Sequence, residues 1–316
     1  MVTALKPFLS LLLPLGVLSL AACSTLPPIT TAVGPPETVM TIQDQRLNEI
    51  SGMASSARAP GVLWLHNDSG GEPRLFAVGP DGETLGTLEI TNAKARDWEE
   101  LSRFDWEGES WLLIADVGDN NAVRSDTTIY LLPEPDPALF ETQPTIRMPA
   151  RVVLPFRYEN GPRDCEGVAV DVANRQILLI SKRTEPPVLY TLPLDLTRNN
   201  GDPPLIAKKS TPLIGIKPPT PVERALPGRL GEFRSSVTAF DISPDDRTAA
   251  VLTYGNVYLY HREPGATWIE TFGGLPERIP VKGLSQAESL CFDEGGATLL
   301  LSTEGDNPPV LRHRLP

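Results

Sequence analysis

The chain has 316 residues, of which 41% are hydrophobic, so it is long enough to bury a core in one large domain or two small ones. Its formal net charge of −12 argues against binding nucleic acid or an anionic membrane surface through bulk electrostatics. Three histidines in the whole chain argue against a histidine-rich zinc site.

The first 22 residues have the order of a secretory signal peptide. A short start with one positive charge, Lys6, precedes an apolar run over residues 8–20, and small residues follow. The run is too short for a membrane-spanning helix, which needs about 20 residues. Residues 20–23, Leu-Ala-Ala-Cys, resemble the lipobox of bacterial lipoproteins, which implies cleavage before Cys23 and a lipid anchor on its thiol. The alternative is a plain signal peptide with an incidental cysteine.

The residues after the cleavage site predict where the protein is held. Ser24 is not the aspartate associated with inner-membrane retention, so we expect an extracytoplasmic protein, on the outer membrane if the cell is Gram-negative. Residues 23–36 combine the lipidated cysteine with a stretch rich in Pro and Thr, which predicts a semi-extended tether. Residues 37–316 then form a single domain.

From Val39 onward the chain lacks helical periodicity. It shows short apolar or alternating runs bounded by Gly, Pro, Asn and Asp, which are typical of strands. The runs recur in sets of four, namely 49–53, 61–66, 74–78 and 84–90; 97–101, 111–115, 128–132 and 151–156; 164–170, 176–180, 188–192 and 205–208; 236–242, 248–252, 257–260 and 268–272. A last set has three runs, 286–292, 298–302 and 310–314.

Four strands per unit, repeated every roughly 50 to 70 residues, predict an all-β fold, a β-propeller of five four-stranded blades. The unpaired run at residues 37–44 is expected to supply the missing outer strand and close the ring, which removes an exposed edge. A sixth blade is the alternative if residues 214–233, which we interpret as an insertion, contain strands, although their prolines oppose this. An open two-sheet sandwich is a further alternative.

Carboxylates recur at two positions near the starts of the first strands. The first position holds Glu49, Asp97, Asp164, Ser236 and Gln286, and the second holds Ser51, Glu99, Glu166, Thr238 and Glu288. First strands line the channel of a propeller, so equivalent positions form a ring, in which carboxylates repel one another unless a proton, a hydrogen bond or a cation intervenes. Calcium takes about six to eight oxygen ligands and suits such a ring. The predicted metal ligands are Glu49, Asp97, Glu99, Asp164, Glu166 and Glu288.

Polar turns after the second strands are expected at the same face of the ring. Arginines also precede three first strands, so acids and bases meet at one mouth, which fits a metal-bridged small anionic ligand. The predicted ligand-binding residues are Asn67, Asp68, Asp119, Asn120, Lys182, Arg183 and Glu304. The alternative for each residue is structural, because such side chains often accept backbone N–H bonds in turns.

Other reactive residues favour no second site. His66 has no evident Ser or Cys partner and no Gly-x-Ser-x-Gly elbow occurs, which argues against a Ser–His–Asp hydrolase. Cys165 and Cys291 lie in apolar strand patterns, so we expect buried free thiols, with a disulfide as the alternative. The expected role of Trp64, Trp98 and Trp111 is packing between blades, so they are not counted among the site residues.

Three segments resemble the first strands of phytase-like propellers and of the SdiA-regulated periplasmic proteins. They are residues 48–53 (Asn-Glu-Ile-Ser-Gly-Met), 164–170 (Asp-Cys-Glu-Gly-Val-Ala-Val) and 287–290 (Ala-Glu-Ser-Leu). The resemblance implies an acidic site facing the channel, often calcium-binding, with phosphoester or ester hydrolysis in some members. Two hypotheses follow: a calcium-dependent hydrolase, and a tethered binding or scaffolding propeller whose acids are structural.

Overall fold

A computed structural model describes residues 1–2, 35–68, 70–199 and 201–315 of the chain. The predicted signal peptide from residue 3, Cys23 and the predicted tether up to residue 34 lie outside the described residues. Within the described ranges, no helix combines the length and the apolar character needed to cross a bilayer.

The described strands form successive four-stranded antiparallel units, and each unit follows one predicted set of runs except for the outer strand of the fourth unit. The first contains β2 (Ile50–Ser55), β3 (Leu63–Asn67), β4 (Arg74–Val78) and β5 (Thr84–Ile90); the second contains β6 (Trp98–Trp106), β7 (Glu109–Asp116), β8 (Thr127–Pro133) and β10 (Val152–Tyr158). The third contains β11 (Cys165–Asp171), β12 (Gln176–Ser181), β13 (Val188–Pro193) and β14 (Leu205–Pro212); the fourth contains β15 (Val237–Ile242), β16 (Thr248–Thr253), β17 (Asn256–His261) and β18 (Glu277–Pro280). The last contains β19 (Ala287–Phe292), β20 (Thr298–Thr303), β21 (Pro309–Arg314) and β1 (Glu37–Thr41).

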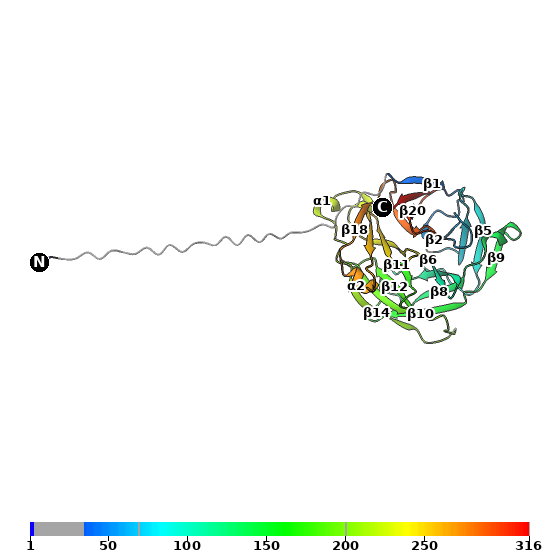
Figure 1. The fold of residues 1–316 in the computed structure, drawn as a ribbon, viewed down its shortest axis with the longest axis horizontal. Coiled ribbons are helices and arrows are strands. Elements are labelled where there is room, and N and C mark those ends of the chain that lie inside the picture. The colour runs from blue at the N-terminus through cyan, green and yellow to red at the C-terminus, as the bar shows by residue number, and fades with distance from the viewer. Residues whose placement is uncertain (3–34, 69, 200, 316) are drawn as a thin grey trace.

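The units are arranged around a central axis, as a propeller. The innermost strands β2, β6, β11, β15 and β19 each contact the next, and β19 contacts β2 again. Figure 1 shows the chain running once around this ring, with blue β1 beside the red and orange end of the chain. The all-β propeller prediction is therefore confirmed, and the count of five blades stays a prediction with which this strand order agrees.

Strand β1 closes the ring, as the incomplete last set of runs predicted. It pairs antiparallel with β21, with Glu37 opposite Arg312 and Thr41 opposite Pro309. The following residue, Ile42, is fully buried, and Val39 and Met40 pack on the same core cluster. The N-terminal run thus supplies both backbone partners for β21 and apolar contacts beneath it.

Two parallel pairings join the outer edges of neighbouring units, and neither was predicted. Strand β9 (Thr145–Met148) leaves the second unit and pairs parallel with β5 of the first. Strand β10 pairs parallel with β14, so the second and third units share one eight-stranded sheet. These pairings cover edges that would otherwise expose backbone donors and acceptors.

The prediction of a strand over residues 268–272 was wrong, because Trp268–Phe272 forms the short helix α2. Thr267 and Glu270 form a capping box at its N-terminus, which satisfies backbone N–H groups that a helix leaves unpaired. Trp268 and Phe272, one turn apart, are fully buried against the third and fourth units. The outer strand of this unit is instead β18, a few residues further along the chain.

The segment 214–233 is an insertion, as interpreted from its prolines. It contains a single turn of helix, α1 (Pro221–Arg224), and the 3-10 turn η2 (Gly228–Leu230), and no part of this fully described segment is a strand. It therefore adds no sixth blade.

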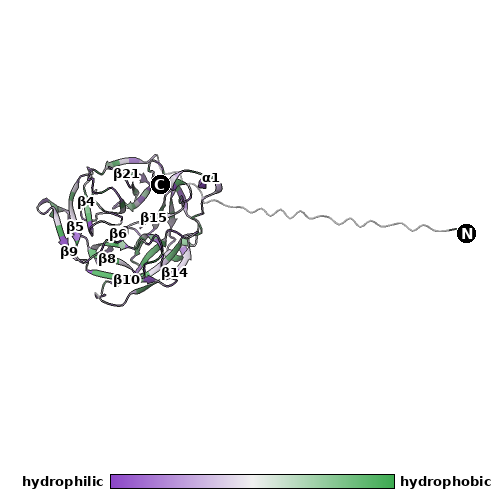
Figure 2. Cartoon of the chain, turned by 180° about the vertical axis from the view of Figure 1, so that it is seen from behind, coloured by the Kyte–Doolittle hydropathy of each residue, from purple (hydrophilic) through white to green (hydrophobic). Residues whose placement is uncertain are grey.

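Apolar side chains of neighbouring units pack against one another in core clusters. Figure 2 shows hydrophobic residues, in green, on strands such as β4, β8 and β10. Trp64 and Trp98 lie in the cluster between the first and second units, and Trp111 lies in the cluster between the second and third. Cys165 and Cys291 are buried free thiols, as predicted, and burial raises the pKa of both.

Glu134 is a buried carboxylate that ties the first unit to the second. Its Oε1 accepts hydrogen bonds from Ser56 Oγ (2.5 Å) and Trp64 Nε1 (2.9 Å). Its Oε2 accepts from the backbone N–H of Ala57 (3.2 Å) and from Ser110 Oγ (2.7 Å). Each carboxylate oxygen thus accepts from one N–H group, and an N–H group can only donate.

We expect Glu134→Gln to destabilise the domain although it preserves the side-chain shape. In either orientation the new amide NH₂ faces the N–H of Trp64 or of Ala57, which leaves buried donors opposed and costs about 2–3 kcal/mol. Urea unfolding measures the difference, with the exposed Glu141→Gln as the matched control. Equal stability of the two variants would contradict the proposed role of Glu134 in holding the first and second units together.

Candidate functional site

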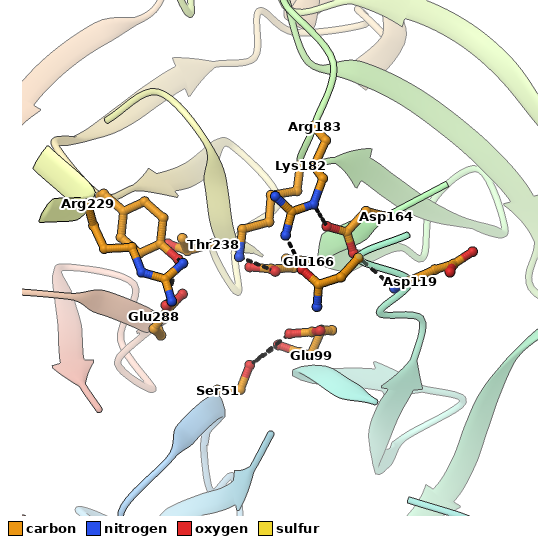
Figure 3. Close-up of polar contacts among 12 residues, drawn as sticks. Ser51, Glu99, Asp119, Asp164, Glu166, Lys182, Arg183, Arg229, Thr238 and Glu288 are labelled. Atoms are coloured by element: carbon orange, nitrogen blue, oxygen red, sulfur yellow. Dashed lines mark hydrogen bonds and ion pairs between the residues drawn. The ribbon is translucent and has the colours of Figure 1, made fainter. Parts of the chain in front are cut away.

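A bulge in each innermost strand positions one side chain at the channel. The pairing of β2, β6, β11, β15 and β19 with the next strand skips one residue near the start of each. A skipped residue leaves the ladder, and the bulge re-aims its side chain. The skipped residues are Ser51, Glu99, Glu166, Thr238 and Glu288, the second position of the ring predicted from the sequence. All five are buried and face a common space in Figure 3.

The two hydroxyl members of this ring hold neighbouring strands together. Ser51 Oγ donates to the backbone oxygen of Glu99 (2.9 Å), and Thr238 Oγ1 donates to the backbone oxygen of Ala287 (2.9 Å). Ser51 also lies 3.4 Å from Oε2 of Glu99. The carboxylate members therefore carry the charge at the channel mouth, while the hydroxyls fix the spacing of the strands.

The carboxylates form two overlapping groups among the described residues. In one, ligand oxygens of Glu99, Asp164 and Glu166 all lie within 4.8 Å of one another, and all three residues are buried. In the other, the same spacing joins Asp68, Asp97 and Glu99. Glu99 belongs to both groups, so the mouth is a continuous acidic surface from the first unit to the third.

Burial and mutual repulsion make these acids reluctant to ionise together. Burial, with the nearby charge of Glu166, raises the pKa of Glu99 well above its usual value. Burial likewise raises the pKa of Glu166, although Lys182 opposes this effect. Burial, with the charge of Asp68, raises the pKa of Asp97 to about 6. A proton or a cation is thus favoured at this mouth.

Two basic residues of the loop after β12 reach into the acidic group, as Figure 3 shows. Lys182 Nζ donates to Glu166 and lies 5.4 Å from the ring centre of Tyr254. Arg183 Nε lies 2.6 Å from Asp164 Oδ2, and the same guanidinium donates to Asn120. Both predicted anion-binding cations therefore already contact predicted metal ligands.

Several predicted ligand-binding residues serve the loops around the mouth. Asp119 accepts the backbone N–H groups of Val123 (2.9 Å) and Arg124 (2.8 Å), and its own N–H donates to Asp164 Oδ1 (2.9 Å). Asn67 donates to the backbone oxygen of Arg46 (2.5 Å). These two side chains point their polar atoms at backbone and support the mouth from behind.

The remaining predicted residues lie at the edge of the mouth. Glu288 accepts from Tyr254 Oη (2.7 Å), and burial raises its pKa. Glu304 accepts from Gln286, and burial together with the charge of Glu288 raises its pKa to about 7. Glu49 is exposed and belongs to neither acidic group.

Sequence reasoning missed two residues of the mouth. Arg229, from the insertion, donates to Tyr254 Oη (3.0 Å) and stacks on that ring at 5.2 Å, so it extends the network that ends at Glu288. A Cβ at Gly118 would overlap Glu99 Oε1 and lie 2.5 Å from Asp97 Oδ2. Gly118 therefore leaves the space in which these carboxylates meet. The insertion gave no sequence signal for Arg229, because its contacts depend on the path of the loop.

His66 belongs to the packing around the mouth. Its side chain is fully buried, Nδ1 lies 2.9 Å from the backbone oxygen of Asn67, and the ring packs edge-on against Trp98 at 5.4 Å. Burial lowers its pKa. The neutral imidazole lies against Gly52 and supports Trp98, which stands between Asp97 and Glu99 in the sequence.

No protein-family model matches the sequence, and the search of curated proteins finds no match. Solved structures similar to this chain include a gluconolactonase from Xanthomonas campestris, 12% identical, covering 92% of this chain and 95% of that chain with a TM-score of 0.47. The WD40 domain of Neurospora crassa Pan2 is 9% identical over 92% and 98% of the two chains, with a TM-score of 0.45. U3-55K is 13% identical over 84% and 68%, with a TM-score of 0.41. At these identities the likeness says nothing about activity.

Proposed function

We propose that this protein is a lipid-anchored, extracytoplasmic β-propeller whose channel mouth binds a divalent cation and a small anionic ligand. The observation that carries the proposal is the position of Glu99, whose carboxylate belongs to both acidic groups. Glu99 is buried, and its pKa is raised by burial and by neighbouring acids, so its ionised form needs a positive partner. A cation placed among these oxygens supplies that partner.

The donor set fits calcium. The two groups offer carboxylate oxygens from Asp68, Asp97, Glu99, Asp164 and Glu166, with neither His nor Cys in either group. Hard cations such as calcium prefer oxygen ligands, whereas zinc prefers nitrogen and sulfur. These five residues are the ones that would hold the ion, and Gly118 keeps the space around Glu99 and Asp97 open.

The reaction class that fits this site is ester or phosphoester hydrolysis, which the resemblance to phytase-like propellers also implies. When bound, the cation would supply Lewis-acid chemistry and a more acidic water. Arg183, whose side chain is 40% exposed, is placed to orient an anionic group beside the acids.

One observation favours the alternative of a non-catalytic scaffold. Lys182 pairs with Glu166 and Arg183 pairs with Asp164, so these protein cations already neutralise part of the acidic mouth. If they neutralise it fully, the carboxylates are structural and calcium is not required. The two hypotheses differ in how the folded protein responds to calcium.

Calcium is expected to raise the melting temperature of the wild-type protein relative to chelator. Binding to the folded state alone stabilises it by about 2.7 kcal/mol at a hundredfold excess over Kd. Glu99→Gln preserves shape and the Ser51 contact but removes the shared charge, so it should lose most of this response. Melting curves in chelator and in millimolar calcium measure it, with the exposed Glu263→Gln as control.

Gly118→Ala is a second variant for the calcium melting experiment, and it leaves every charge in place. The added methyl would displace the carboxylates of Glu99 and Asp97, so the calcium response should fall as in Glu99→Gln. Gly295→Ala is the matched control, because no atom lies within 4 Å of the position that a Cβ would take there. A wild-type protein that melts identically in calcium and chelator would favour the scaffold and remove the proposed cation.

The lipid anchor has a separate test. Cys23→Ser removes the thiol that a lipobox presents, so we expect the protein to leave the membrane fraction or to accumulate as an uncleaved precursor. Fractionation and gel mobility of wild type and variant measure both outcomes. If the two proteins fractionate and migrate identically, the anchor proposal is wrong.

A further inference from the structure

A pocket of about 300 Å³ lies directly beside the acidic mouth. One wall is the loop after β12, including Lys182, Arg183 and Pro186, and the other is the insertion with Ile216 and Phe233. Lys182 and Arg183 belong both to this wall and to the ion pairs with Glu166 and Asp164. The pocket and the acidic group therefore share two cationic side chains.

The lining of this pocket is divided between charge and apolar surface. Arg224 lies on the rim of the pocket, and its side chain is 42% exposed. Its ion pair with Glu185, at 3.5 Å, is weak because both side chains are exposed to solvent. Phe233 is 40% exposed, although a large aromatic side chain is usually covered. Glu232 is the other acid in the lining. A ligand with an anionic head and an apolar arm would match both halves.

The volume limits the size of the ligand. A space near 300 Å³ corresponds to about ten water molecules in the liquid. This suffices for a single-chain anion. A carboxylate or a phosphate monoester with one apolar substituent is a ligand of this size.

From this arrangement we infer that the pocket binds a small organic anion with an apolar arm, and that calcium strengthens this binding. The inference rests on the proposed function. A cation held by Asp164 and Glu166 replaces Arg183 and Lys182 as the partner of those acids. The released cations then face the anionic head, while Phe233 and Pro186 cover the apolar arm. Coupling of this kind is reciprocal, so the anion also strengthens calcium binding.

Calorimetric titration of octanoate and acetate tests the inference, on a chain that begins at Ser24 and keeps every described strand. Each buried methylene is worth roughly a factor of four in affinity, so octanoate should bind at least about tenfold tighter than acetate. Calcium should tighten octanoate binding about tenfold, within the usual range of coupling between two sites. 1-Octanol, which lacks the charge, should bind weakly.

Two variants separate the apolar and charged halves. Phe233→Ala should remove most of the preference for octanoate and leave the calcium melting shift unchanged, whereas Leu139→Ala, a control with 51% exposure outside the pocket, should change neither. Arg183→Gln should weaken both anions about tenfold. Equal affinities for octanoate and acetate, or a Phe233→Ala variant that behaves like the control, would overturn the inference. If octanoate binds tighter than acetate in a Phe233-dependent way but calcium shifts neither melting nor affinity, the cation site and the coupling are refuted. The assignment of the pocket as an anion site would still stand.

Discussion

Removing residues 37–44 is expected to destabilise the whole domain. The deletion removes β1, which is the only described partner of the outer edge of β21, and it removes the fully buried Ile42. Val39 and Met40, which pack on the same cluster, are also lost. Burial of one such aliphatic side chain is worth about 1.5–3 kcal/mol, so the total loss exceeds about 4 kcal/mol.

The melting temperature reports this loss directly. About 4 kcal/mol corresponds to a fall of roughly 10 °C in a domain of this size. The control is a chain that begins at Glu37, which removes only the tether and keeps β1. If chains beginning at Glu37 and at Gln45 melt together, β1 does not close the ring in solution.

In chelator, the stability of the domain is expected to fall as pH rises from about 5 to 8. Burial raises the pKa of Asp241 to about 7, Asp97 to about 6 and Glu304 to about 7. Folded protein therefore retains protons that the unfolded chain releases near pH 4, and that advantage is lost as pH passes through the folded pKa values. For the half-buried Asp241 alone the loss between pH 5 and pH 8 is on the order of 3 kcal/mol, because about two pH units separate pH 5 from its folded pKa.

Melting curves at pH 5 and pH 8 measure this dependence. Asp241 accepts the backbone N–H groups of Ile242 (2.8 Å) and Phe292 (2.9 Å), away from the proposed cation, so its contribution should persist with calcium. The contribution of Asp97 should shrink, because a bound cation favours its ionised form. Buried His66 and His313, whose pKa values are lowered, oppose this trend, so the Asp241→Asn variant isolates the share of Asp241. A variant with the same pH dependence as the wild type would contradict the raised pKa of Asp241.

Much of the fold follows from local pattern. Strands over residues 74–78 and 84–90 coincide with β4 and β5, because alternating apolar residues between turn formers fix both the period and the ends of a strand. Comparing the units also placed Glu99, Glu166 and Glu288 at one equivalent position. The structure adds the physical reason, which is a bulge that recurs in every innermost strand and turns that residue to the channel.

Other features were not predicted from the sequence. Residues 268–272 were expected to form a strand, but they form a helix, because Trp268 and Phe272 lie four residues apart on one buried helical face. The Thr-x-x-Glu spacing of Thr267 and Glu270, which forms the capping box, was the local signal for this helix. The parallel pairing of β9 with β5 joins segments about one unit apart in sequence. Such pairings depend on which strand edges meet once the ring has formed, because the residue pattern of an edge strand does not identify its partner.

The charges at the mouth also divide into features set by local sequence and features set by tertiary contacts. The sequence by itself determined that Glu99, Glu166 and Lys182 reach this face, because strand period and turn position are local properties. Only the tertiary structure decided their partners: Lys182 pairs with Glu166, Arg183 pairs with Asp164, and Arg229 arrives from an insertion. Charge pairing depends on distances of a few ångströms between units, since the interaction falls with separation and strengthens with burial, and those distances exist only after the ring has closed.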